Sequence, residues 1–434
     1  MTTRRLLCAG LLAGLSVSTL TAQEPRRVTL ADALRLAAQN SPTMVQARQD
    51  VRVAYWGERT ALAAFLPTLS ATASGSKAGT ERYNQATGQR VVNPFPFSEQ
   101  YGLRASMDLF TGFRRGANRR AASATIDLRE ATRVRQEYAV ALATKQAFFT
   151  ALATAELVAV SEIRLRRAGE QMNLVSEKLR LGATTRSDSL QSRVEYGNAQ
   201  LQLIQARANQ RYAEANLGRA VGAEGLVAPV PDTTLETRLG PLDTTALRRE
   251  ALAAAPSIRE AEASVVSAGS SLRAARSQYL PTVSASASKS WSRSTGGITD
   301  TIPFLPQWSI GLSLSYPLFN GFSRESGVAS ADAAVISARS RLRDARLALD
   351  ASLTQSFAAL EAAAARIDIA RVSVAAAEEN LRMQRERYRL GTSTIVEVLT
   401  TQVSLDQAQV DLVQARYDYL VARAQIEAYV GHAL

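Results

Sequence analysis

The sequence predicts a mainly α-helical chain with a membrane β-barrel part, built as two copies of one structural unit. Three observations in the 434 residues lead to this prediction. Short stretches recur in the same order about 209 residues apart, long stretches contain neither glycine nor proline, and four short segments alternate apolar with small or polar residues. Internal repetition and hydrophobic periodicity are the main fold signals in a single sequence.

The N-terminus is predicted to be a secretory signal peptide at 1–22. Arg4 and Arg5 precede an apolar run, and small or polar residues follow near Ala22, which is the order of residues in such signals. A membrane anchor is the alternative, but the run is too short to span a bilayer comfortably. Cys8 belongs to this run, so the mature chain would contain no cysteine. We therefore expect an exported protein without disulfides.

The repeated unit is marked by landmarks that return in order, which argues against chance similarity of low-complexity sequence. We predict a first repeat at 23–221, a second repeat at 248–434 and a joint that contains proline and glycine at 222–247. Each repeat is expected to contain one helix, then two barrel strands, then a long helical hairpin. The landmarks are "FLPTLSATAS" with "YLPTVSASAS", "LFTGFRRG" with "LFNGFSRE", and "LRLGATTRSD" with "YRLGTSTIVE".

Four segments of about ten residues have the alternation and flanking aromatics of outer-membrane barrel strands. They lie near 67–77, 100–111, 281–291 and 307–319, and the stretch "NQATGQRVVNPFPF" between the first two is predicted to be a loop. Soluble hairpins with one solvated face are the alternative. A barrel in lipid must close, and closed barrels have at least about eight strands. Several chains would therefore have to contribute to one barrel.

Each repeat is predicted to end in a long helical hairpin. Residues 328–390 and 392–430 contain no glycine or proline. The Leu-Gly pairs would form the turns near 181–188 and 390–397, with a positive φ at Gly182 and Gly391. A coiled-coil seam is predicted from a 3-4 spacing. Its positions are Leu190, Val194, Gly197, Leu201, Ile204 and Ala208 in the first copy, and Leu399, Val403, Asp406, Val410, Val413, Tyr417 and Leu420 in the second.

The composition argues against several classes of function. The net charge is +12, but the arginines are spread among acidic residues, as on solvated helix faces, so we expect no nucleic-acid partner. His432 is the sole histidine and Cys8 the sole cysteine. Nucleophile pairs and His-rich metal sites are therefore excluded, and no phosphate-binding loop follows a strand. We expect no enzyme, cofactor or metal site.

The duplicated unit, the paired strands, and "YRLGTSTIVEVL" followed by "QAQVDLVQARYDYLVA" resemble the TolC family of outer-membrane efflux proteins. The resemblance implies a homotrimer with a shared barrel of about twelve strands in outer-membrane lipid. It also implies an α-helical barrel that projects into the periplasm and an equatorial belt around 222–247.

The function that this resemblance implies is a passive, gated exit duct of a tripartite efflux pump or type I secretion system. Its partners would be a periplasmic adaptor and an inner-membrane RND or ABC transporter. The alternative is a periplasmic coiled-coil adaptor or scaffold, which would leave the four alternating segments unexplained. A third possibility, an exported hydrolase, is opposed by the lack of histidine and cysteine.

The resemblance also implies a gate at the hairpin tips, where a Tyr of the second hairpin bonds an Asp of the first. Tyr388 and Asp188 occupy these positions, and Ser393 stands where many members have an Arg, with Arg186 as a candidate substitute.

Two further gate positions are Glu397 and Thr400, which stand where some members have two rings of Asp. With one acidic ring we expect weaker cation selectivity, and repulsion among three Glu397 carboxylates would raise some of their pKa values. The alternative is a solvated helix charge at Glu397.

The same resemblance makes the tips the place where the adaptor docks. The implied contact residues are Leu181, Gly182, Thr185, Leu390, Gly391 and Thr394. The alternative, that the glycines only cap helices, is compatible with docking.

Overall fold

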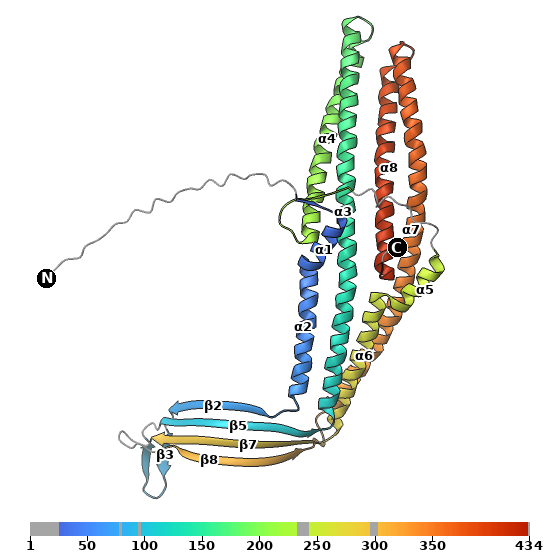
Figure 1. Cartoon of the computed structure of the whole chain (residues 1–434). Coiled ribbons are helices and arrows are strands. Elements are labelled where there is room, and N and C mark those ends of the chain that lie inside the picture. The colour runs from blue at the N-terminus through green and yellow to red at the C-terminus, as the bar shows by residue number, and fades with distance from the viewer. Residues whose placement is uncertain (1–25, 78–79, 94–96, 232–242, 296–302, 433–434) are drawn as a thin grey trace, which may run out of the picture.

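The computed structural model describes residues 26–77, 80–93, 97–231, 243–295 and 303–432. The predicted signal peptide and the middle of the predicted joint lie outside these residues. The molecule is elongated, with a β-sheet at one end and long helices that run away from it (Figure 1). Within the described residues, no helix has an apolar stretch long enough to cross a membrane.

Two long helical hairpins dominate the chain, as predicted. The first consists of α3 (Arg114–Arg180) and α4 (Arg186–Val221), and the second of α7 (Ser323–Arg389) and α8 (Ile395–Val430). α3 and α7 have 67 residues each, and α4 and α8 have 36 each. A helix of that greater length extends about 100 Å. Equal lengths are what a duplicated unit would produce.

Two shorter helices precede each strand pair, where the sequence analysis expected one. They are α1 (Leu30–Asn40) and α2 (Pro42–Ala63), then α5 (Thr244–Ala254) and α6 (Pro256–Arg276). A proline opens the second helix of each pair, and the residue before it, Ser41 or Ala255, has an extended ψ. Proline disfavours helical backbone in the preceding residue, so each helix is divided at this point. The turn η2 (Ser277–Tyr279) follows α6.

The main sheet has four antiparallel strands in the order β2-β5-β7-β8, so the two strand pairs join through β5 and β7. The strands are β2 (Thr68–Lys77), β5 (Phe97–Thr111), β7 (Thr282–Thr295) and β8 (Leu305–Ser315). The prediction of four strands is confirmed for this sheet. Every residue of β2 and β8 is exposed, so one chain covers neither face of these outer strands.

Two other strand pairs were not predicted. β3 (Thr80–Asn84) and β4 (Gln89–Asn93) form a hairpin whose turn and second strand lie inside the stretch 84–97 that was interpreted as a loop. That interpretation was wrong for these residues, because Gly88 adopts a φ of 67° and closes a turn between two strands. The short strands β1 (Arg26–Val28) and β6 (Val227–Pro229) pair in parallel, which fastens the start of the described chain to the segment after α4.

The strand-to-helix junctions before α3 and α7 use the same backbone device. Gly112 and Phe113, like Gly321 and Phe322, all have φ between 60° and 64°. At the first junction, Arg115 donates to the carbonyls of Leu109 (2.8 Å) and Ala64 (3.3 Å) and lies over the Phe65 ring.

At the second junction, Arg324 donates to the carbonyls of Pro317 and Leu318 and lies over the Tyr279 ring. Each arginine therefore satisfies carbonyls at the place where a strand gives way to a helix.

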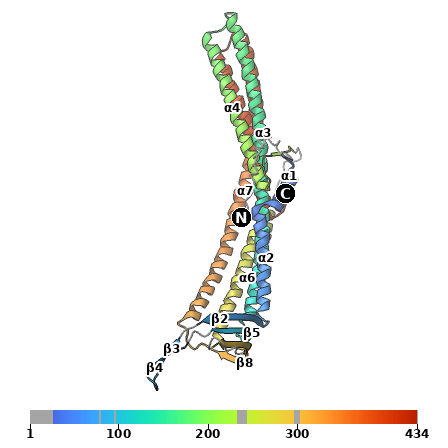
Figure 2. The same cartoon turned by 90° about the vertical axis from the view of Figure 1, so that its left-hand side faces the viewer.

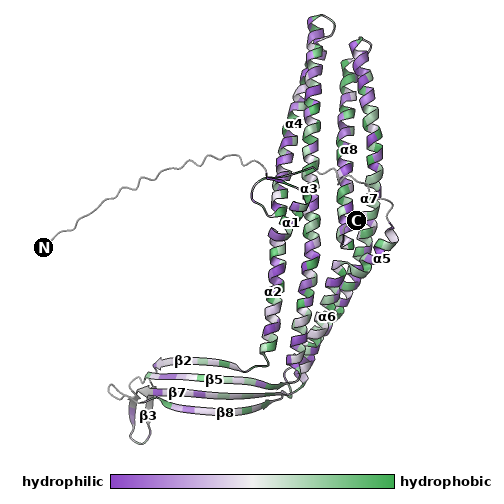
Figure 3. Cartoon of the chain, viewed as in Figure 1, coloured by the Kyte–Doolittle hydropathy of each residue, from purple (hydrophilic) through white to green (hydrophobic). Residues whose placement is uncertain are grey.

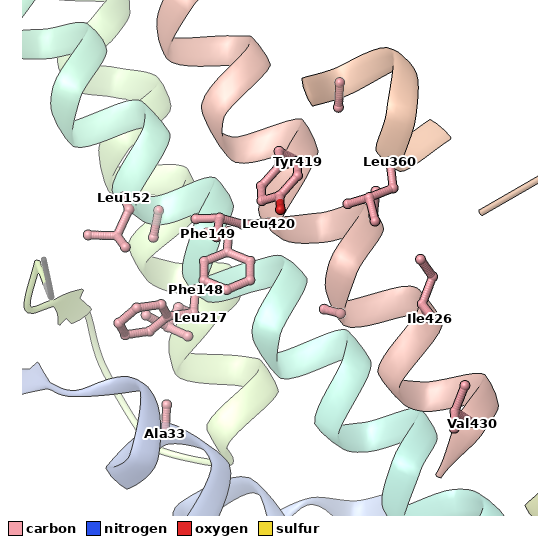
Figure 4. Close-up of a cluster of buried hydrophobic side chains, with 14 of the residues drawn as sticks. Ala33, Phe148, Phe149, Leu152, Leu217, Leu360, Tyr419, Leu420, Ile426 and Val430 are labelled. Carbon is pink, nitrogen blue, oxygen red and sulfur yellow. The ribbon is translucent and has the colours of Figure 1, made fainter. Parts of the chain in front are cut away.

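The main hydrophobic core lies midway along the helices, where α1 and the two hairpins converge (Figure 4). Phe148, Leu217 and Ile426 are fully buried there. A smaller cluster near the tips contains Val175, Leu381, Tyr388, Ile395, Val398 and Leu405. Elsewhere hydrophilic and hydrophobic residues alternate along the helices (Figure 3), and the hairpins remain narrow in a view turned by 90° (Figure 2).

The seam predicted on α4 does not pack inside the chain, so this prediction was wrong for the single chain. Leu190, Val194, Leu201 and Ile204 are each more than half exposed. α4 packs through another face that contains Ala199, Leu203 and Leu217. On α8 the predicted seam is partly correct, since Asp406, Val413 and Leu420 are buried. Periodicity identified apolar stripes, but α4 has two, and only one faces α3.

Candidate functional site

The two hairpin tips have the same backbone construction. Gly182 and Gly391 adopt φ of 71° and 79°, as predicted. The amides of Gly182 and Ala183 donate to the carbonyls of Leu179 and Lys178, which is the Schellman arrangement that ends a helix. Leu181 and Leu390 precede the glycines and are 74% and 73% exposed. Each tip thus presents one large apolar side chain to solvent.

A capping residue starts the second helix of each hairpin. The hydroxyl oxygens of Thr185 and Thr394 accept hydrogen bonds from the amides of Asp188 (3.1 Å) and Glu397 (3.3 Å). The Asp188 carboxylate accepts in return from the Thr185 amide, which completes a capping box. Asp188 and Glu397 therefore occupy equivalent first-turn positions. The spacing T-x-x-D/E contained this signal, and the sequence analysis missed it.

Thr184 lies between the two residues of the implied gate. Its hydroxyl donates to Asp188 Oδ2 at 2.6 Å, and its Oγ1 lies 3.5 Å from the Tyr388 hydroxyl. Because Thr184 has only one hydroxyl proton, the Tyr388 hydroxyl is the donor in the second contact. Within the described residues of this single chain, Asp188 and Tyr388 share Thr184 instead of bonding directly.

Tyr388 is held in place by the apolar cluster and by a lysine. Its side chain is 5% exposed and packs among Val175, Leu381 and Val398. Lys178 Nζ donates to the Tyr388 carbonyl at 2.7 Å and lies 4.2 Å from the centroid of its ring. Neither Thr184 nor Lys178 was predicted as a site residue, because both contacts with Tyr388 connect the two hairpins.

Both tip carboxylates are stabilised in their charged form. The Thr184 hydroxyl, with the amide and hydroxyl of Thr185, lowers the pKa of Asp188. The Ser393 hydroxyl, followed by Thr394 and the nearby Arg387, lowers the pKa of Glu397. Hydrogen bonds donated to a carboxylate favour ionisation. The pKa increase expected for three neighbouring Glu397 residues concerns an assembly and stays a prediction.

The other implied gate residues are near the network without joining it. Arg186 is exposed, and no described residue forms an ion pair with its guanidinium. Thr400 is also exposed and lies one turn after Glu397 on α8. Ser393 donates to Glu397 Oε2 at 2.8 Å, which repeats the bond between Thr184 and Asp188. No described group of His, Cys, Asp and Glu could hold a metal ion.

Comparison with known proteins identifies the family. The model of the family described as outer membrane efflux protein matches residues 33–223 and 247–432. The chain belongs to the outer membrane efflux protein family. Because it belongs to this family, the protein is located in the outer membrane.

Individual relatives support the same conclusion. The chain is 26% identical over 310 residues to the outer membrane efflux protein BepC of Brucella suis, covering 71% of this chain and 64% of BepC. It is 32% identical over 176 residues to the alkaline protease secretion protein AprF of Pseudomonas aeruginosa, covering 39% of this chain and 36% of AprF. The chain thus spans less than two thirds of the length of these curated relatives.

A solved structure shows the same fold. The chain superposes on the CmeC outer membrane channel of Campylobacter jejuni with a TM-score of 0.77 and 18% sequence identity. The match covers 93% of this chain and 85% of CmeC. At this identity the likeness concerns the fold alone. It agrees with the helical hairpins and the four-stranded sheet described above.

In this outer membrane efflux protein, a row of polar pairs joins the two hairpins below the tips. Arg167 bonds Asp406 at 3.1 Å across α3 and α8. Arg164 contacts the same carboxylate and bonds Glu195 of α4 at 2.8 Å. Further down, Glu156 pairs with Arg416, and Lys145 with Glu427. The contact between the hairpins is therefore polar from the central core to the tip cluster.

Asp406 is the most buried charge in this row, with 4% exposure. Burial raises its pKa, while Arg164 and Arg167 act in the opposite direction. Asp406 was predicted only as a seam position, and the spacing did not indicate its partners, which lie about 240 residues away along the chain.

Proposed function

We propose that the protein is the passive, gated exit duct of a tripartite efflux pump or type I secretion system, and not an enzyme. The observation that carries the proposal is the four-stranded sheet with two outer strands that no described strand covers, in a chain of the outer membrane efflux protein family. A sheet in lipid cannot leave its edges unpaired. Three chains would supply about twelve strands, enough for a closed barrel.

The dimensions support this assignment. β5 has 15 residues and β7 has 14. Strands of this length extend roughly 45–50 Å, which exceeds the hydrocarbon thickness of about 30 Å even for a tilted strand. The longest helices would add about 100 Å on the periplasmic side. One assembly could therefore cross the outer membrane and reach deep into the periplasm.

The exposed face of α4 supports a homotrimer. Leu190, Val194, Leu201 and Ile204 form an apolar stripe that the single chain leaves in water. Such stripes usually pack against another helix. In a trimer, the hairpin of the next copy would cover the stripe and close the helical tube.

The gate that we propose is the set of Thr184, Asp188 and Tyr388. It links a turn of the first hairpin to the end of α7 in the second. The bond that crosses between the hairpins joins the neutral hydroxyls of Tyr388 and Thr184 and contributes only about 0.5–1.5 kcal/mol, so a docking partner could break it. Separation of the two hairpins would then open the tube.

The docking partner that we propose is a periplasmic adaptor, which connects the tube to an inner-membrane RND or ABC transporter. The exposed Leu181 and Leu390, each beside a glycine with positive φ, supply the apolar contacts. BepC is an efflux protein and AprF a protease secretion protein, so the cargo class of this chain, small molecules or proteins, stays open.

The test is single-channel conductance of the full-length protein in planar bilayers. Tyr388→Phe and Asp188→Ala should each raise the conductance, because each removes one end of the network. Tyr212→Phe is the matched control, since Tyr212 lies on α4 with 71% exposure and outside the gate. If both variants form channels of unchanged conductance, the proposed gate is wrong but the proposed duct is not. If the natural protein forms no channels, the proposed duct is wrong.

A further inference from the structure

A cavity of about 550 Å³ lies where the sheet meets the helices. It is formed by the end of β5, the start of α3 and the end of α6, which converge at one end of the molecule (Figure 1). Its lining includes Arg115, Arg120, Arg273 and Arg276, and no carboxylate. The cavity therefore has a strong positive charge that no acidic residue in its lining offsets.

The start of α3 adds to this charge. Helix N-termini carry a partial positive charge, which acidic residues in the first turn usually offset. α3 has no acidic residue in its first turn, and it begins with Arg114 and Arg115. Its N-cap residue, Phe113, makes no side-chain cap, and the neutral Thr111 hydroxyl oxygen accepts from the Arg115 amide at 3.4 Å. The carbonyls at the end of α6 balance part of the charge, since Arg273 Nε donates to Gly269 O at 3.4 Å. Such partial charges are too small to balance four guanidinium groups.

The second junction shows what the first lacks. α7 carries Glu325 in its first turn, 3.9 Å from Arg324. The corresponding position of α3 is Gly116, which lines the cavity and has open space where a Cβ would stand. The second copy of the unit thus supplies its own anion, and the first leaves room for one.

The cavity also has an apolar side. Phe65, Phe110 and Leu280 line it together with Phe113, which is 74% exposed. Aromatic side chains beside cations are typical of the boundary between a membrane and water. In an outer-membrane chain, the end of the sheet next to the helices is the periplasmic boundary, where phospholipid phosphates lie. We propose that this cavity binds the phosphate headgroup of a glycerophospholipid, with an acyl chain along Phe113.

The test is native mass spectrometry of the full-length protein in detergent, titrated with phosphatidylglycerol. Diacylglycerol with the same acyl chains lacks the phosphate and shows whether binding requires it. Inorganic phosphate lacks acyl chains and shows whether binding requires them. One variant combines Arg120→Gln, Arg273→Gln and Arg276→Gln. A second, Gly116→Glu, introduces the carboxylate of the other junction. Arg119→Gln is the matched control, because Arg119 neighbours Arg120 on α3 but does not line the cavity.

The expected result is retention of phosphatidylglycerol by the natural protein, with binding about tenfold weaker in both test variants and unchanged in the control. Since Gly116→Glu adds a side chain into open space, its loss of binding would not result from misfolding. Equal binding of diacylglycerol would overturn the proposal, as would displacement by inorganic phosphate alone. Absence of bound lipid in the natural protein would mean that another chain covers the cavity, and would also overturn it. This test measures bound lipid and not channel conductance, so the proposed lipid site and the proposed duct are tested independently.

Discussion

At the scale of single residues, Thr184 connects the two sides of the proposed gate. Its hydroxyl donates to Asp188 and accepts from Tyr388, so neither gate residue bonds the other directly. We therefore expect Thr184 of the first tip to matter as much to the proposed gate as the two residues that family resemblance indicates. A hydroxyl at this place explains both the lowered pKa of Asp188 and the position of the tyrosine hydroxyl.

Thr184→Val should therefore raise single-channel conductance by about as much as Tyr388→Phe. Valine keeps the shape of threonine but removes the hydroxyl that both neighbours use. Thr150→Val is the control, because the Thr150 hydroxyl donates only to the carbonyl of Gln146 in its own helix. Equal conductance in Thr184→Val and the natural protein would contradict the bridging role.

The pH dependence of the gate should follow from Asp188. Hydrogen bonds from Thr184 and Thr185 lower the folded pKa of Asp188 below the ordinary value of an aspartate, so the stabilising contribution is present above that ordinary value and is lost as the pH falls through the folded pKa. We expect conductance to stay constant from neutral pH to about pH 4 and to rise below it. Asp188→Asn should abolish this rise, whereas a rise that persists in Asp188→Asn would assign it to another group.

The sequence contained part of this site. The Leu-Gly turns, the exposed leucines and the equivalence of the two tips were predictable, because they depend on local spacing. The contacts of Thr184 and Lys178 with Tyr388 were not, because they depend on how the tips of the two hairpins lie against each other. Arg186, chosen because it neighbours Asp188 in the sequence, forms no ion pair with a described residue.

At the scale of elements, charged pairs join the two hairpins between the central core and the tip cluster. Asp406 bonds Arg167 and contacts Arg164, and all three side chains are at most 13% exposed. Buried pairs of this kind contribute little net stability when complete, but leave unpaired charges when one partner is removed. We therefore expect the polar contact to fix the register of α8 against α3.

Asp406→Asn should destabilise the docking of the two hairpins by about 3 kcal/mol, because it leaves the buried guanidinium of Arg167 without its carboxylate and removes one of the two carboxylates that Arg164 contacts. Hydrogen exchange of α8 amides near residue 406 should accelerate, while the strands stay protected. Asp411→Asn is the control, since Asp411 is exposed and accepts from Gln407 of its own helix. Equal acceleration in both variants would contradict the role of Asp406.

Helices were the best-predicted elements, because long stretches without glycine or proline leave few other possibilities. The β3-β4 hairpin was missed because prolines and glycines next to it suggested a loop. The exposed seam of α4 was misassigned because an apolar stripe shows that something covers it, but not which helix does.

At the scale of the whole molecule, one chain is incomplete in two places. The outer strands β2 and β8 are exposed along their full lengths, and α4 exposes an apolar stripe. A second and third copy would cover both at once, since closing the sheet and closing the helical tube require the same rotation about one axis. The trimer is therefore the claim on which the gate and the duct depend.

The most direct measurement is the mass of the full-length complex after extraction from the outer membrane in a mild detergent. The account predicts a particle with three copies of the chain. It also predicts that Ile204→Arg, which places a charge within the exposed α4 stripe, shifts the particle toward single chains, while a control change at exposed Gln205 does not. A natural protein that is monomeric and stable in water without detergent would contradict the account.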